Sequence, residues 1–299
     1  MAKRKLTEQQ TLQKDAGREM SVVKRDDMVQ KGRHQLSIRE QRCVLYAISR
    51  IKPTDEVFQE YTFSLSDFYT LCGLNSESYT ELKGILKGLS DKSWWATIDD
   101  KGTESVVRWF TTVRTNKKSG KVTIEFHKDM MPYLLQLSKQ NAFYTSYNLQ
   151  YVLPMSCQSS PRLYEILKSY QKNNREWFFP TEELQRLLNA EKYSRNFNDF
   201  RKRVLDPAIE EINQYTDLNI AMDVVKEGRG GRITRVIFYM ADKSDAALLD
   251  AKRAIRDKLD GQLTIEDILA QLPDEEESVK AKFMRENPPK RKKRPSEGF

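Results

Sequence analysis

The sequence predicts an α+β protein in which one order of elements occurs twice. In each half a helix is followed by a strand, two more helices and a pair of strands joined by a turn. A long helix in the second half has apolar side chains on one face and basic and amide side chains on the other. The chain carries 51 Lys and Arg against 43 Asp and Glu, a formal net charge of +8 at pH 7. Together these observations favour a binding protein whose partner is a polyanion.

The elements of the first half follow from hydrophobic periodicity and turn residues. Ser37 is a suitable cap for the first helix, and Gly73 ends the second. Val106 to Arg114 is predicted as one continuous strand, which the turn NKKSG joins to the next. The predicted elements are helices over 36–51, 66–73 and 79–89 and strands over 58–63, 94–98, 106–114 and 121–126.

The second half repeats the order. Thr181 is expected to cap its second helix. Pro207 cannot donate a backbone hydrogen bond, so it either kinks the long third helix or starts a new helix capped by Asp206. The predicted elements are helices over 161–171, 181–188 and 196–215 and strands over 176–179, 218–225 and 232–240.

The long helix is the most informative element. Its apolar stripe consists of side chains spaced by three or four residues, namely Phe197, Phe200, Val204, Ala208, Ile212 and Tyr215. The other faces carry basic and amide groups. Arg can pair with guanine and Asn with adenine in a DNA major groove. The candidate DNA-binding residues here are Arg195, Asn196, Asn198, Arg201, Lys202 and Arg203.

The two final strands of this half enclose the glycine-rich loop KEGRGG, which predicts a β-hairpin. The hairpin carries four basic residues, Lys226, Arg229, Arg232 and Arg235, against one acid, Glu227. A helix-turn-helix followed by a basic hairpin is a winged helix, whose wing can contact flanking phosphates or the minor groove. The fold class is therefore α+β with two tandem winged-helix domains.

An ordinary α+β lobe with a solvated charged surface is the alternative. Residues 175–240 hold eleven basic and eleven acidic residues, so the lobe is not basic on average. The charges are sorted, however: five of the six charged residues from Lys192 to Arg203 are basic. This clustering favours a phosphate-binding face.

The corresponding helix of the first half exposes fewer basic residues. Lys83 and Lys87 are its only cations, and Thr80 lies one turn before Lys83. Thr80, Lys83 and Lys87 are therefore weaker candidates, for which phosphate contact or self-association is favoured over base reading.

Four blocks of the chain resemble the Rep_3 family of plasmid replication initiators, which bind repeated sites called iterons with tandem winged-helix domains. The blocks are LSIREQRCVLYAISRI, SSPRLYEILKSY, FNDFRKRVLDPAIEEIN and RITRVIFYM, and the resemblance runs from about Met28 to Lys243. It implies binding of origin repeats as a monomer, melting of adjacent A·T-rich DNA, and recruitment of the host initiator ATPase and replicative helicase. It further implies that the protein can dimerise and repress its own gene at an inverted repeat.

The residues provide no catalytic constellation, and we expect no enzymatic activity, cofactor or metal. There is no P-loop sequence, and His34 and His127 lack the spacing of a metal site, so both are expected at the surface or as caps. Cys43, Cys72 and Cys157 are expected as buried free thiols. No membrane span or signal peptide is expected, which favours a cytoplasmic bacterial protein. A dedicated transcriptional repressor and a rolling-circle nicking enzyme remain the rival functions.

The predicted organisation has four parts. They are a flexible basic arm over 1–33, a first winged-helix domain over 34–150 with dimerisation or phosphate contacts, a second over 151–243 with the main DNA contacts, and a charged tail over 244–299. In the tail, Ala246 to Leu259 is predicted as a helix and Thr264 to Leu272 as a short amphipathic one. The tail ends in the basic run PPKRKKRP, for which DNA or partner binding and simple solubilising disorder both stay open.

Overall fold

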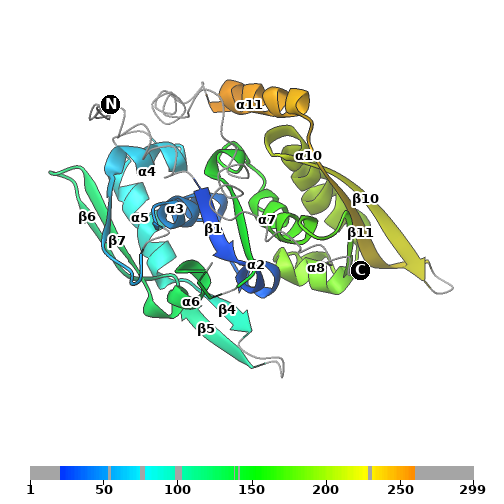
Figure 1. The fold of residues 1–299 in the computed structure, drawn as a ribbon, viewed down its shortest axis with the longest axis horizontal. Coiled ribbons are helices and arrows are strands. Elements are labelled where there is room, and N and C mark those ends of the chain that lie inside the picture. The colour runs from blue at the N-terminus through cyan, green and yellow to red at the C-terminus, as the bar shows by residue number, and fades with distance from the viewer. Residues whose placement is uncertain are drawn as a thin grey trace, which may run out of the picture.

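The computed structural model describes residues 21–259, apart from 53–54, 75–77, 98–102, 138, 141 and 228–230. Two lobes lie side by side, and helix α7 lies between them (Figure 1). Each lobe contains a three-stranded antiparallel sheet and three principal helices in the order that the sequence predicts. The protein is therefore built from two tandem winged-helix domains.

The second domain has the simpler topology. Strand β9 pairs with β11, and β11 pairs with β10, so the first strand of the domain lies beside the last. Apolar side chains from alternate strand positions, including Phe179, Val236 and Phe238, face the helices and are buried. The elements are α7 (Ser160–Gln171), β9 (Glu176–Pro180), α8 (Thr181–Leu187), α9 (Phe197–Phe200), α10 (Asp206–Tyr215), β10 (Leu218–Glu227) and β11 (Arg232–Asp242).

The first domain has the same sheet order, with β3 beside β7 and β7 beside β6. Its principal elements are α3 (Ile38–Ser49), β3 (Tyr61–Ser64), α4 (Leu65–Cys72), α5 (Tyr79–Asp91), β6 (Phe110–Asn116) and β7 (Lys121–Phe126). Ser37 and Glu40 form a capping box at the start of α3, and Gly73 ends α4 with a φ of 62°. These predicted helix boundaries are confirmed.

An additional hairpin interrupts the first domain. Strands β4 (Ser93–Thr97) and β5 (Glu104–Arg108) pair with each other, and β2 (Arg33–His34) joins them on the β4 side. The prediction of one strand over 106–114 is wrong, because the chain leaves this small sheet at Trp109 and enters the main sheet at Phe110. Trp109 is 2% exposed, so the burial of this large ring at the break accounts for two strands in place of one.

The N-terminal segment is folded from Ser21 onward, which corrects the expectation of a flexible arm over residues 21–33. Strand β1 (Ser21–Arg25) pairs with β8 (Tyr144–Asn148), and α2 (Asp26–Lys31) leads into β2. Helix α6 (Met131–Leu134) precedes β8. The remaining part of the expected arm, residues 1–20, lies outside the described residues.

Helix α11 (Asp245–Leu259) confirms the helix predicted at the start of the tail. It packs across α10 with Ala251, Ile255 and Leu259 buried (Figure 1). The amphipathic segment over 264–272 and the basic run PPKRKKRP lie outside the described residues. Within the described part of the chain, no helix is long and apolar enough to cross a membrane.

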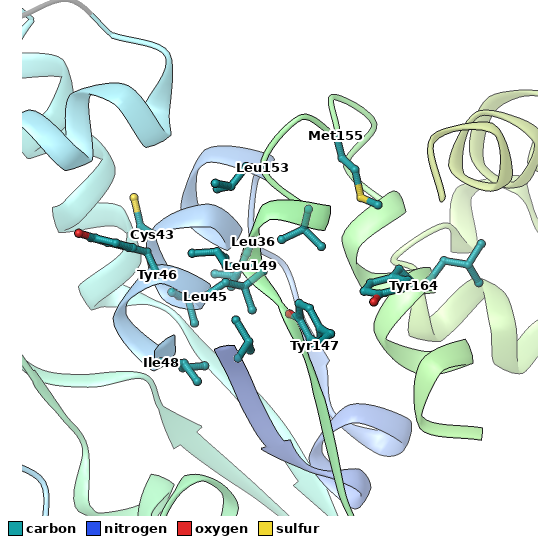
Figure 2. Close-up of a cluster of buried hydrophobic side chains, with 14 of the residues drawn as sticks. Leu36, Cys43, Leu45, Tyr46, Ile48, Tyr147, Leu149, Leu153, Met155 and Tyr164 are labelled. Carbon is teal, nitrogen blue, oxygen red and sulfur yellow. The ribbon is translucent and has the colours of Figure 1, made fainter. Parts of the chain in front are cut away.

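The junction between the domains is buried and holds charged groups. Figure 2 shows its apolar part, where Leu45 and Leu149 lie near Tyr147 of the first domain, and the Tyr147 ring meets Tyr164 of α7 edge-on at 5.2 Å. Lys24 on β1 forms an ion pair with Glu165 on α7, which also accepts a hydrogen bond from Tyr147. Burial lowers the pKa of Lys24, and Glu165 opposes that shift. The two domains are thus joined through α7 by a packed and ionic interface.

The expectations for the cysteines and for His34 need correction. Cys43 and Cys72 lie together in the core of the first domain with their sulfur atoms 3.5 Å apart, while Cys157 is only half-buried. His34 is no surface or cap residue, since its Nδ1 atom is buried without a partner and its ring meets Trp109 edge-on at 5.6 Å. His127 does cap a short helical turn by accepting a hydrogen bond from the backbone of Asp129.

Candidate nucleic-acid interface

The long helix of the second domain contains a wide turn in its middle. α9 continues into a π-helical turn, Arg201–Leu205, and then into α10. The backbone N–H of Asp206 donates to the carbonyl of Arg201, five residues back. Pro207 supplies no N–H, and its ring would crowd the carbonyl four residues earlier, so a widened turn before it relieves both problems. Asp206 does not cap α10, because Leu205 occupies the cap position and the Asp206 carboxylate pairs with Arg201.

The apolar stripe of this helix packs as predicted. Phe200, Ala208 and Ile212 are fully buried, and Phe197 packs on the same core. Leu205 is also fully buried, although the predicted stripe does not include it. Since the packed face is fixed by these residues, the basic and amide side chains of the helix are directed to solvent.

The candidate DNA-binding residues of this helix differ in the contacts that their side chains make. Arg195, Asn198 and Lys202 are exposed, and their side chains make no hydrogen bond or ion pair with the described part of the chain. Asn196 caps α9, accepting from the Asp199 N–H and donating to its carboxylate. Arg201 pairs with Asp206 at 3.2 Å, and Arg203 lies 3.8 Å from Asp199.

The ion pairs of the helix and the wing are exposed. Arg201 and Arg203 keep 53% and 68% of their side-chain surfaces open to water. Exposed pairs of this kind are worth about 0–1 kcal/mol, so a DNA phosphate can replace the carboxylate at little cost.

The wing of the second domain holds its arginines against neighbouring acids. Arg232 donates to Glu182 at the start of α8, and Arg235 donates to Glu227 while its guanidinium lies 5.6 Å from the Phe178 ring. Lys226 is exposed and has no partner among the described residues. Arg229, which the sequence places between β10 and β11, lies outside the described residues. Thr181, which was predicted to cap α8, instead donates to the carbonyl of Ile233, so it ties α8 to the wing strand.

Helix α5 of the first domain places its candidates at the surface. Thr80, Lys83 and Lys87 are all exposed, and the Lys83 ammonium lies 6.0 Å from the Tyr79 ring. Lys117, in the turn between β6 and β7, approaches the same ring at 5.5 Å. The start of α5 and the first wing therefore gather basic residues around one aromatic side chain.

The first wing was missed as a candidate. Lys117, Lys118 and Lys121 are exposed at or beside its turn. The segment NKKSGK holds the signal, because three lysines at a predicted hairpin turn repeat the pattern of the second wing.

The structure thus brings the predicted residues to the surface in separate groups. Among the described residues, no hydrogen bond or ion pair joins the helix candidates to those of the wing in the second domain. No group of three His, Cys, Asp or Glu residues able to hold a metal ion occurs in the described ranges. What the groups share is positive charge displayed around a helix-turn-helix and a hairpin, the arrangement of a duplex-binding winged helix.

The comparison with known proteins covers both domains. Residues 21–168 match the first winged-helix domain of the initiator replication proteins, and residues 180–240 match the second. The chain belongs to the initiator replication protein family. Because the two matches follow the two winged-helix domains of the structure, the family assignment extends over most of this initiator protein.

Two curated relatives and one solved structure are similar to it. A replication initiation protein of Escherichia coli is 25% identical over 226 residues, which are 71% of this chain and 67% of the relative. The PI protein of Escherichia coli is 23% identical over 163 residues, 48% of this chain and 52% of that protein, so the match spans about half of its length. The structure of the Pi initiator protein in complex with iteron DNA is 20% identical with a TM-score of 0.61, covering 76% of this chain and 99% of that one. This likeness confirms the tandem winged-helix fold.

Proposed function

We propose that this initiator protein starts plasmid replication by binding repeated double-stranded DNA sites at the origin. The observation that carries the proposal is the helix from Phe197, whose apolar face is buried while Asn198, Lys202 and the neighbouring arginines are exposed beside a basic wing. The solved complex of the Pi initiator with iteron DNA supports repeats as the target. The protein acts by binding, without catalytic activity, cofactor or metal of its own.

The proposed mode of DNA binding follows from which candidate side chains are exposed and which form ion pairs within the protein. The helix enters the major groove, where Asn198 and Arg201 contact base edges and Lys202 and Arg203 contact bases or phosphates. Lys226, Arg229, Arg232 and Arg235 of the second wing hold the adjacent backbone, and the first domain adds phosphate contacts through α5 and its own wing. Several bound copies bend and strain the neighbouring A·T-rich DNA, which costs a few kcal/mol per deformed site and prepares it for melting.

Further steps belong to the same proposal. The bound protein recruits the host initiator ATPase and the replicative helicase, and it represses its own gene as a dimer at an inverted repeat. Membership of the initiator replication protein family supports these steps. No contact among the described residues bears on them.

Footprinting on the DNA that flanks the gene, at two salt concentrations, tests the proposal. We expect protection of several direct repeats spaced by whole helical turns, weakening as salt rises. Protection of one inverted repeat alone would leave a repressor and remove the support for origin opening. Incubation with supercoiled origin DNA and a divalent metal is expected to give no open circles, and a covalent tyrosine adduct would identify a nicking enzyme instead.

A further inference from the structure

Residues 152–159 connect the two domains, and we call this segment the connector. One carboxylate of α10, the helix that continues from the proposed DNA-reading turn, holds it in place. Glu211 on α10 accepts hydrogen bonds from the backbone N–H groups of Ser156 and Cys157, at 2.8 and 3.1 Å. It also accepts from the hydroxyl groups of Ser156 and Ser160, at 2.7 and 2.5 Å. Both carboxylate oxygens are therefore engaged, by Ser156 and Cys157 ahead of α7 and by Ser160, its first residue.

Side chains of the first domain form hydrogen bonds with the same connector. Arg42 on α3 donates to the carbonyl of Met155 at 2.7 Å, and Gln41 donates to the carbonyl of Gln158 at 2.9 Å. Figure 2 shows Met155 on this loop, between the helices of the two domains. Burial lowers the pKa of Arg42, and the negative charge of Glu211 is among the groups that oppose this shift.

Glu211 also lies beside the N-terminus of α7, where it accepts a hydrogen bond from the Ser160 hydroxyl. The Ser159 side chain makes no capping hydrogen bond there. The two backbone N–H groups that donate to Glu211 precede α7, so its carboxylate interacts favourably with the helix dipole without capping the N–H groups of the helix. Its neighbour Glu210 is exposed and has no hydrogen bond or ion pair among the described residues, so the two adjacent glutamates differ sharply in environment.

We infer that Glu211 is a positioning residue that fixes the DNA-reading turn of the second domain relative to the first domain. It lies on α10, which continues directly from the turn carrying Arg201, Lys202 and Arg203. A second contact secures the other end of α10, where Asp217 accepts from Tyr164 and Lys168 of α7 at 2.8 and 2.6 Å. The inference rests on the proposed function, because a fixed spacing matters only when both domains bind one DNA site.

The test compares Glu211→Gln with Glu210→Gln in the full-length protein, since both changes remove one negative charge from α10. The probe is a duplex obtained by selection from a random library with the wild-type protein. The part of its footprint that a Lys83→Ala and Lys87→Ala double variant erases is assigned to the first domain, and the rest to the second. Binding is then measured on the complete duplex and on a shortened duplex that holds only the second-domain part.

For Glu211→Gln we expect about a tenfold weaker affinity for the complete duplex and loss of the first-domain part of the footprint, with unchanged affinity for the shortened duplex. Glu210→Gln should match the wild type on both. Equal losses on both duplexes, no loss on either, or a wild-type footprint confined to the second-domain part would overturn the inference. Should Glu211→Gln not fold, Ser160→Ala removes the 2.5 Å hydrogen bond alone and decides by the same comparison. If the wild type selects no duplex, the proposed function itself fails, which is a different result.

Discussion

The candidate residues on the helix that we propose binds DNA differ in the contacts they must break before they can bind it. Arg201 and Arg203 must leave exposed carboxylates, whereas Lys202 has no partner in the described part of the chain. Long, unpaired cations bind phosphate without first breaking an intramolecular contact. Lys202 is therefore the residue whose removal tests DNA contact with the fewest side effects.

We expect Lys202→Ala to abolish specific binding while the unfolding temperature stays within about 1 °C, because the side chain is exposed and forms no hydrogen bond or ion pair with the described residues. Lys252→Ala on α11 is the matched control, an exposed lysine of a helix that carries no predicted contact. Competition between the selected duplex and random DNA measures discrimination. Unchanged discrimination would remove Lys202 from the interface.

His34 is a single residue that makes the folding stability depend on pH. Burial lowers the pKa of its imidazole well below 6.5, and the positive charges of Arg162 and Lys24 lower it further. The unfolded chain then binds a proton below about pH 6.5 that the folded protein does not, so stability falls as the pH falls. The slope for one proton reaches about 1.4 kcal/mol per pH unit.

We expect His34→Gln to lose less stability than the wild type between about pH 7 and pH 5.5, as measured by urea unfolding. His127→Gln is the control, since these are the two histidines of the chain. The assignment fails if the His34 variant keeps the wild-type slope.

At the scale of elements, the π-helical turn sets the orientation of the side chains that we propose contact DNA. We expect Pro207→Ala to let residue 207 donate to the carbonyl of Arg203 and so to restore regular helix, which turns Arg201 to Arg203 by about 100° relative to α10. Specific binding should fall at least about tenfold while thermal stability is kept or raised, since proline is unfavourable inside a helix.

Pro180→Ala at the exposed end of β9 is the control for the loss of a proline. Wild-type binding by Pro207→Ala would mean that the packing of Phe200 and Leu205, and not the proline, maintains the wide turn.

The second wing is expected to contribute affinity without sequence preference. We expect Lys226→Ala to weaken binding to all duplexes and to reduce the slope of log affinity against log salt by about 0.9, as for one lost phosphate contact. The same result is expected for Arg229→Ala. Titrations at four salt concentrations on selected and random duplexes provide the measurement. A changed base preference would show that the wing reads sequence.

At the scale of the whole molecule, the two domains depend on charges buried between them. Lys24 and Glu165 are 5% and 4% exposed in their side chains. We expect Glu165→Gln to cost about 3–5 kcal/mol of unfolding free energy, because it leaves the Lys24 ammonium buried without a counter-charge.

The double variant Lys24→Met with Glu165→Gln should recover most of that loss, since no unpaired charge remains. Chemical denaturation of the wild type, the single variant and the double variant measures both effects. A single variant as stable as the wild type would mean that water or another group reaches Lys24.

Much of the local structure could be predicted from the sequence. The strand over 121–126, the capping box at Ser37 and the buried stripe from Phe197 to Tyr215 all depend on neighbours within a few residues. The exposed candidates follow from the same periodicity, because a helix that buries one face presents the other to solvent. The sequence by itself therefore determined the two winged helices and which of the described candidate residues are exposed.

Only the tertiary structure decided which distant groups meet. Ser21 to Arg25 looked like part of an arm, yet it forms a strand whose partner β8 lies more than a hundred residues later. The break at Trp109, the burial of His34 and the attachment of Glu211 to the connector likewise depend on contacts between segments far apart in the chain. Local periodicity specifies a local conformation, whereas strand pairing and buried charge contacts are set by three-dimensional packing that no short window of sequence contains.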